Sequence, residues 1–309
     1  MKKYFFLTAI AAFALCSCVK DEPDGLWNKT KITFESPVIS TMTKAVAGEI
    51  VDPYPTSENF SVYAVYTDDE LSSTTSDASI YPYMNNVKTA YAQDINGWDP
   101  GAVSGAVSYY WPKHGYLTFA AYSPSDAFND GTITWSAETG FNVENFKVKD
   151  SPAEQYDLMF SKLEKNKQSS TGTNTNYQGV DIVFGHALSS IKFKMNNSYT
   201  SDGVTINITG ITINNAYSKG TYTQNLKSDY SNDYDSNGSV WKSHSEEVSS
   251  YEVYNGTAGT TNQNYLNTSD VILLPQALKH DKENHEVTVT VNYTMGTPAS
   301  GNKPIPQEQ

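Results

Sequence analysis

Arginine is missing from this chain, and all 21 of its basic residues are lysine. The planar guanidinium group of arginine is the usual choice for binding phosphate and carboxylate groups through two parallel hydrogen bonds. The chain also carries 34 acidic residues, a net charge of -13 and an isoelectric point of about 4.7. An acidic chain without arginine is poorly suited to a polyanion, so we expect no nucleic-acid partner and no nucleotide chemistry.

Cysteine is almost as scarce, with Cys16 and Cys18 as the two examples, both at the end of an apolar run over residues 4–15. Two lysines precede the run, and a basic start followed by a short apolar core is typical of a secretion signal. The core is too short for a membrane-spanning helix, which needs about 20 residues. Since no cysteine follows, the rest of the chain has no disulfide, no cysteine zinc site and no thiol nucleophile.

The spacing around Cys18 indicates a lipid anchor. A bacterial lipoprotein signal places a branched apolar residue three positions before the acylated cysteine and a small residue directly before it, and Leu15 and Ser17 meet that description for Cys18. Cys16 follows bulky Leu15 directly. We interpret residues 1–17 as a lipoprotein signal peptide and Cys18 as the lipidated first residue of the mature protein. An ordinary signal peptide with incidental cysteines is the alternative.

Residues 18–30 are mostly polar and begin with an acidic stretch, so we interpret them as a lipidated tether. The stretch resembles the acidic tag that directs Bacteroides-type lipoproteins to the outer face of the outer membrane. A generic flexible linker is the alternative. We therefore expect a surface-exposed lipoprotein of the cell outer membrane of a Gram-negative bacterium.

Motifs for catalysis are also lacking. The sequence has no glycine-rich phosphate loop, no His-Glu-x-x-His and no Gly-x-Ser-x-Gly, so we expect no enzyme activity, no cofactor and no metal site. His280 and His285 flank a polar stretch that fits a hairpin turn better than a metal site. His186 precedes a strand, and we expect it to be hydrogen-bonded and partly buried rather than catalytic.

The sequence predicts an all-β protein. It is rich in tyrosine, with 22 residues, and apolar residues alternate with polar ones in short runs separated by turn residues. The first strong run is 59–67. The last run, 286–293, is especially clear, because Val287, Val289, Val291 and Tyr293 share one face. We expect further strands at 31–35, 116–122, 131–135, 141–148, 156–163, 180–184, 190–195, 204–208, 210–216 and 271–274. Residues 227–261, rich in Ser, Asn, Asp and Gly, predict long exposed loops.

The length permits two domains. Residues 166–179 form a polar stretch without an apolar face, which we interpret as a linker between an N-terminal domain, 31–165, and a C-terminal domain, 180–309. A long surface loop inside one domain is the alternative.

Three motifs carry a family resemblance. Residues 184–190 (FGHALSS), followed by a lysine-bearing strand, resemble a motif of the fimbrillin family, the pilus subunit lipoproteins of Bacteroidetes. Residues 273–276 (LLPQ) resemble that family's second-domain segment. Residues 110–112 (YWP) and 117–124 (LTFAAYSP) resemble its first-domain signature. The three motifs occur in the family's order.

The resemblance implies two transthyretin-like Greek-key β-sandwich domains in tandem, and an adhesive fimbrium built with other pilin subunits by strand exchange after a surface protease removes the first strand. Ile32 and Phe34 then belong to the removable strand, 31–44, and cleavage falls between Lys44 and Ala45. The protease must accept lysine. Loss of such an edge strand would expose backbone groups and an apolar groove to another chain. The alternative for Lys44 is an ordinary exposed lysine, one among 21.

Two other functions stay open. A surface lipoprotein that binds glycans could use Trp98, Trp135 and Trp241 as stacking platforms. A fimbrial anchor or tip protein is the second, because the chain departs from the family in its C-terminal part, where further strands are expected after 287–293. The predicted C-terminal domain would then be incomplete.

Overall fold

The computed structural model describes residues 27–35, 37–41, 50–72, 75–128, 132–169, 179–194, 205–224, 240–242, 248–258, 266, 270–276, 278 and 286–296. Cys18, Lys44, Ala45, His280 and His285 lie outside these residues, so the predictions made for them stay predictions. None of the described segments forms a helix long and apolar enough to cross a membrane.

The described residues form strands and three short 3-10 turns, which confirms the all-β prediction. The 3-10 turns are η1 (Asp77–Ser79), η2 (Pro100–Ala102) and η3 (Pro152–Glu154). The strands are β1 Trp27–Lys31, β2 Val38–Thr41, β3 Ile50–Pro53, β4 Phe60–Thr67, β5 Tyr81–Ala92, β6 Gly97–Asp99, β7 Tyr110–Pro112, β8 Tyr116–Ser123, β9 Ile133–Ser136, β10 Gly140–Lys147, β11 Met159–Ser161, β12 Glu164–Lys167, β13 Val183–His186, β14 Ser189–Ile191, β15 Thr205–Tyr217, β16 Lys219–Thr223, β17 Val240–Lys242, β18 Val248–Ala258, β19 Val271–Leu273 and β20 Thr288–Gly296.

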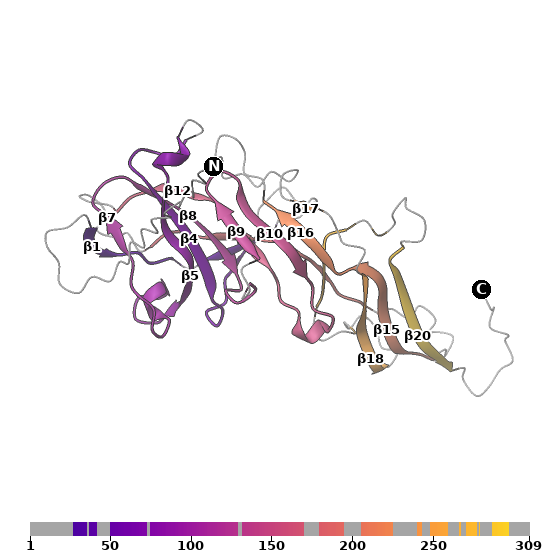
Figure 1. Ribbon diagram of the computed structural model, residues 1–309. Coiled ribbons are helices and arrows are strands. Elements are labelled where there is room, and N and C mark those ends of the chain that lie inside the picture. The colour runs from indigo at the N-terminus through magenta and orange to yellow at the C-terminus, as the bar shows by residue number, and fades with distance from the viewer. Residues whose placement is uncertain are drawn as a thin grey trace, which may run out of the picture.

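A nine-stranded sheet forms the centre of the molecule, in the order β3-β2-β13-β11-β8-β4-β5-β6, with β12 also paired to β8. Its middle strands, β4 and β8, pair antiparallel over seven consecutive positions from Ser61↔Tyr122 to Thr67↔Tyr116. The smaller sheets have the orders β17-β16-β10-β9, β18-β15-β20, β14-β19 and β1-β7. Figure 1 shows the whole as an elongated molecule, with β1 and β7 near one end and β18, β15 and β20 at the other.

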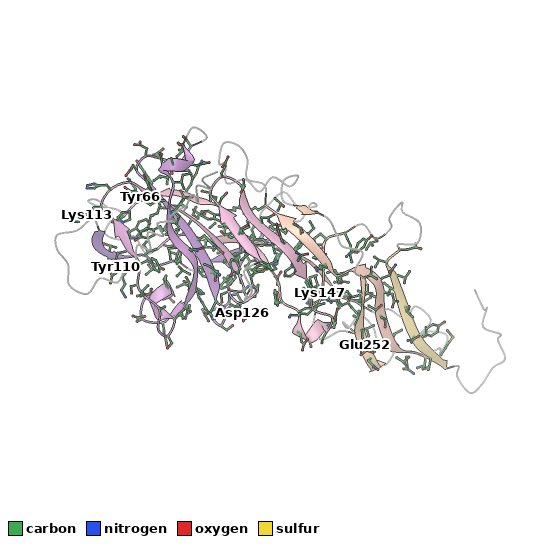
Figure 2. All side chains as sticks on the ribbon, viewed as in Figure 1. Tyr66, Tyr110, Lys113, Asp126, Lys147 and Glu252 are labelled. Carbon is green, nitrogen blue, oxygen red and sulfur yellow. The ribbon has the colours of Figure 1, made fainter. Side chains whose placement is uncertain are left out.

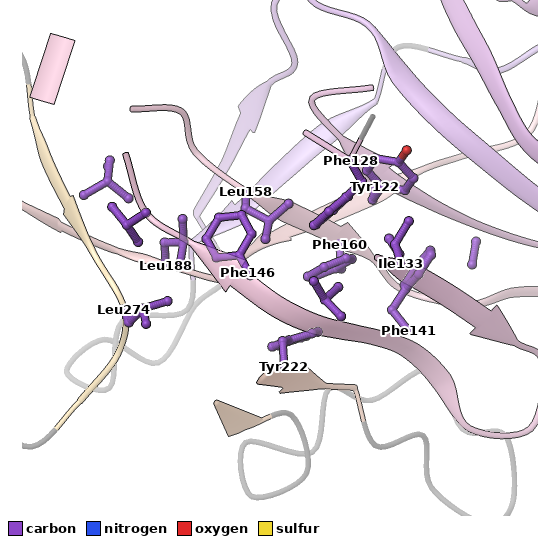
Figure 3. Packing of buried hydrophobic residues seen from close by; sticks show 14 of the residues in the cluster. Tyr122, Phe128, Ile133, Phe141, Phe146, Leu158, Phe160, Leu188, Tyr222 and Leu274 are labelled. Atoms are coloured by element: carbon purple, nitrogen blue, oxygen red, sulfur yellow. The ribbon is translucent and has the colours of Figure 1, made fainter. Parts of the chain in front are cut away.

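The central sheet is covered on both faces, because successive residues of β4 point to opposite sides and both sets are buried. One set joins an apolar cluster that we call the segment core, which includes Ile32, Phe34, Phe60, Val62, Phe119 and Phe184. The other set joins a cluster that we call the central core, which includes Tyr63, Tyr122, Phe141, Phe160, Tyr222 and Leu274. Figure 3 shows the aromatic packing of the central core, in which the rings of Phe160 and Tyr222 stack with their centroids 4.5 Å apart.

Strand pairing crosses the predicted linker in two places. β13 lies between β11 and β2 in the central sheet, although it follows residues 166–179 in the chain. β10 pairs with β16, which also comes after them. The strands on the two sides of the linker thus share sheets and the central core. The division into two domains stays a prediction.

The prediction of loops over residues 227–261 is wrong in part. β17 and β18 fall within this stretch, and β18 is an 11-residue strand that pairs with β15. Its serine, asparagine and glycine residues do not show the alternation of a strand. Among its residues whose burial is described, Tyr251 alone is fully buried, and the long ladder with β15 holds the strand in place. In Figure 2, Glu252 on β18 marks this end of the molecule, Tyr66 and Tyr110 lie at the opposite end, and Lys147 on β10 lies between them.

Candidate functional site

We call residues 27–35 and 37–41 the N-terminal segment. It includes Ile32, Phe34 and the described part of the predicted removable strand, 31–44. Regular pairing begins earlier than predicted, with β1 against β7, and resumes with β2. Between these strands, Phe34 makes one bridge to Trp98 of β6 and a second to Val180. The segment therefore passes between two parts of the molecule that are distant in the sequence.

Backbone hydrogen bonds attach the segment on both sides. On one side, the amides of Ile32 and Phe34 donate to the carbonyls of Tyr109 and Trp98 at 2.8 and 2.9 Å, and the amide of Trp98 donates back to Phe34 at 2.9 Å. On the other side, the amide of Val180 donates to the carbonyl of Thr33 at 2.8 Å, and the parallel pairing continues between β2 and β13. Each such bond contributes about 0.5–1.5 kcal/mol.

This arrangement corrects the expectation of an edge strand. Phe34 has a neighbour on each side, and β2 lies between β13 and β3 in the central sheet. An edge strand leaves one row of backbone groups unpaired, whereas removal of this segment would uncover pairing groups on two neighbours at once. The physical reason is that Val180 lies three residues before the start of β13, so its bridge to Phe34 continues into the pairing of β13 with β2.

The side chains of Ile32 and Phe34 are both fully buried, as the alternation of this stretch predicts. The ring of Phe34 makes edge contacts with Phe60 and Phe119, with centroid distances of 5.7 and 5.8 Å. Full burial of each of the two side chains contributes about 1.5–3 kcal/mol. The segment core thus depends on residues that precede the predicted cleavage point.

Two glycines allow the backbone of the segment to approach its neighbours closely. A Cβ atom on Gly97 would lie 2.8 Å from the carbonyl oxygen of Phe34, and one on Gly179 would lie 2.8 Å from the carbonyl carbon of Phe34 and 2.7 Å from the amide nitrogen of Glu35. Gly179 also has a φ of +138°, which side chains disfavour. Neither glycine was predicted from the sequence: Gly179 directly precedes the predicted strand 180–184, and Gly97 begins β6, which was not predicted.

A pair of carboxyl groups lies where the segment meets the strand after Gly179. Glu35 follows Phe34, Asp181 follows Val180, and the parallel pairing of Phe34 with Val180 places the two acids next to each other. Desolvation raises the pKa of Glu35, and a hydrogen bond and charge repulsion from Asp181 raise it further. At the opposite side, Lys31 and Asp99 form an ion pair at 3.8 Å in which Lys31 is half exposed, so it adds little stability.

Residues of the motifs that carry the family resemblance pack in the core or hydrogen-bond to neighbouring strands. Trp111 of the YWP motif is buried against Phe119, with centroids 5.8 Å apart. Gln276 of the LLPQ motif accepts from the amide of Tyr217 at 2.8 Å and donates to its carbonyl at 3.0 Å. These contacts join the motifs to neighbouring strands.

The prediction for His186 is confirmed, because its Nδ1 lies 2.6 Å from a carboxylate oxygen of Asp157 and its side chain is 35% exposed. The hydrogen bond to Asp157 raises the pKa of His186, although partial desolvation opposes that effect. The pair joins the end of β13 to the loop before β11. Within the described segments, no group of three or more histidine, cysteine or acidic residues is placed to hold a metal ion.

The three tryptophans predicted as stacking platforms have different environments. Trp98 is buried in the segment core, which excludes it as a platform. Trp241 donates its indole N–H to the carbonyl of Ala187 at 2.6 Å and packs against Phe146 and Tyr222. Trp135 is partly exposed and lines a cleft.

Comparison with known proteins places the chain in a family. A model of the fimbrillin-like family matches residues 43–305. Among solved structures, a proposed cell adhesion protein from Bacteroides ovatus is similar, with 14% identity, a TM-score of 0.49, and coverage of 87% of this chain and 86% of that chain. A proposed cell adhesion protein from Bacteroides uniformis has 16% identity, a TM-score of 0.40, and coverage of 87% and 80%. Comparison with curated proteins finds no match.

Proposed function

Because this chain belongs to the fimbrillin-like family, we propose that it is a structural subunit of an adhesive pilus that assembles by strand exchange. Fimbrillin-like proteins are structural proteins rather than enzymes, and the family indicates a position at the cell surface and assembly with other pilin subunits. The finer proposal concerns the N-terminal segment, which we take to be a temporary occupant of the site that a neighbouring subunit fills in the pilus.

The observation that supports this proposal is the placement of Ile32 and Phe34. Both are fully buried, and backbone bonds on either side of the segment hold them in place. If the segment leaves, Trp98 and Val180 lose their bridges to Phe34 and the segment core loses two side chains. A strand from another subunit with apolar residues at the same spacing would restore both, which favours a polymer held by strand pairing.

The proposed route begins with a precursor lipidated at Cys18 and held in the outer membrane by that anchor. A lysine-accepting surface protease then cuts between Lys44 and Ala45, a position that follows the end of β2 at Thr41. Cleavage there separates both the lipid anchor and the whole N-terminal segment from the remainder of the chain. A single cut would thus free the subunit from the membrane and open its site for assembly.

The test compares Lys44→Ala with Lys20→Ala, a control that changes a lysine in the proposed tether. We expect Lys44→Ala to give a folded, palmitate-labelled monomer that does not enter fibres, whereas Lys20→Ala assembles normally. The mature amino terminus, sequenced from purified fibres, should begin at Ala45. Fibre subunits that begin at Cys18 would contradict the proposal and favour a fimbrial anchor or tip protein. Palmitate incorporation by Cys18→Ala would contradict the proposed lipid site.

A further inference from the structure

A cleft of about 410 Å³ lies between β4, β5, η1 and the turn that joins β9 to β10. This volume is within the range of about 300–1,000 Å³ that is typical of small-molecule sites. Strand residues form its floor, among them Val65 and Met84, which are almost fully buried. Its lining combines Tyr63 and Val65 of the central core with Ala64 and Met84 of the segment core, and no residue of the N-terminal segment lines it.

Trp135 supplies the aromatic surface of the cleft. Its ring packs against Tyr63 and Phe141, with centroid distances of 5.8 and 6.3 Å, so its orientation is held by neighbouring rings. Tyr63 is only 7% exposed, whereas Trp135 retains partial exposure. Trp135 is therefore the ring that a ligand in the cleft can contact over an appreciable area.

The rim of the cleft is rich in hydrogen-bond acceptors. Asp77, Asn85, Ser136 and Glu138 line the cleft and are exposed, and they come from η1, β5 and the β9–β10 hairpin. No lysine or histidine is among the lining residues. Carboxylate and amide oxygens accept hydrogen bonds, so the rim suits a ligand with several hydroxyl groups and repels an anion.

The sheet is irregular beneath the cleft. The pairing of β4 with β5 shifts register on either side of Ala64, which lines the cleft. Asn86, next to Asn85, has a φ of +53° and accepts a hydrogen bond from the hydroxyl of Tyr122 at 2.7 Å. Bulges of this kind redirect side chains and are frequent near functional sites. Here the shift occurs at the positions that form the floor.

We propose that this cleft binds a neutral pyranose unit of a glycan. The apolar face of the sugar would lie on the ring of Trp135, since the weakly positive C–H groups of a pyranose match the negative face of an aromatic ring. Its hydroxyl groups would donate to the acceptors on the rim. Acidic sugars are excluded by Asp77 and Glu138. A cationic ligand would favour several exposed rings around it, and the cleft offers mainly one.

The experiment measures saturation-transfer NMR from the full-length protein to methyl glycosides of glucose, galactose, mannose and N-acetylglucosamine. Glucuronate and tetramethylammonium test the anionic and cationic alternatives. We expect transfer to at least one neutral glycoside, with affinity at least tenfold weaker in Trp135→Ala and unchanged in Tyr81→Ala, which alters an exposed ring outside the cleft. Thermal unfolding of each variant checks that it is folded.

A second variant keeps the test informative if Trp135→Ala fails to fold. Glu138→Lys changes an exposed rim residue, and we expect it to weaken the neutral glycoside and to admit glucuronate. Absence of transfer to every neutral glycoside would overturn the proposal. Binding that survives both substitutions, or binding of tetramethylammonium alone, would also overturn it. These results do not depend on strand exchange, because they are measured on the full-length protein and no residue of the N-terminal segment lines the cleft.

Discussion

Two stretches with a similar alternation of apolar and polar residues differ in the burial of their apolar side chains. Ile32 and Phe34 in the N-terminal segment are completely buried. In β20, Val289, Val291 and Tyr293 alternate in the same way, yet they are 49%, 43% and 56% exposed. Both stretches pair with neighbours through the backbone, so strand formation alone does not decide burial.

The difference lies in what covers the apolar face. Val291 pairs with Ile211 and Val289 pairs with Ile213, and paired residues share a face of the sheet. Ile211 and Ile213 on β15 are nearly fully buried, and Ile213 belongs to the central core. The second layer thus covers β15 and ends before β20. The N-terminal segment, in contrast, has aromatic side chains packed around Phe34.

The largest expected effect contrasts Phe34→Ala with Tyr293→Ala. Loss of the buried ring should lower the free energy of unfolding by about 3–5 kcal/mol, because it removes apolar contacts and leaves a cavity. Tyr293→Ala should change it by no more than about 0.5 kcal/mol, as is usual for exposed sites. Urea denaturation followed by circular dichroism measures both. Equal losses of unfolding free energy in the two variants would contradict a larger contribution from the buried ring of Phe34.

A smaller effect is expected at the glycines beside the segment. Gly179→Ala should lower the free energy of unfolding by about 1–3 kcal/mol, because it adds backbone strain at a φ of +138° and crowds the backbone of Phe34 and Glu35. Gly105→Ala is the matched control, since Gly105 also has a positive φ, of +78°, but open space around it. Hydrogen exchange of the Phe34 amide should accelerate only in Gly179→Ala. Faster exchange in both variants would refute the role of crowding.

The smallest expected effect concerns the pKa of Glu35, whose carboxyl group lies next to that of Asp181. The pKa of Glu35 is raised above its ordinary value of 4.5 when the segment is seated, so the seated form binds a proton more tightly than the released form. The contribution of Glu35 to the free energy that holds the N-terminal segment in place is therefore fully present below pH 4.5 and is lost as the pH rises through the raised pKa. Asp181→Asn should lower the pKa of Glu35 and flatten this dependence. Titration of the Glu35 carboxyl by NMR checks it, and an unchanged midpoint would contradict the assigned cause.

Several features of the fold were accessible from the sequence because they depend on local chemistry. Alternation over 59–67 predicted β4, and the same pattern predicted β8 and the strand that contains Val289 and Val291. The three family motifs identified the fimbrillin resemblance before any contact was known, and the family match confirms it. β18 was not predicted, because its polar composition does not indicate a strand and its pairing with β15 holds it in place.

The sequence by itself determined that the chain forms strands, that Ile32 and Phe34 share a face, and that no arginine or late cysteine is available for other chemistries. Only the tertiary structure decided that the N-terminal segment lies between Trp98 and Val180, that Trp98 is buried while Trp135 lines a cleft, and that β20 is left uncovered. Alternation reports the pleat of a single strand, which is local. Neighbours are chosen by pairing and packing between residues far apart in the chain, and a short stretch of sequence carries no record of them.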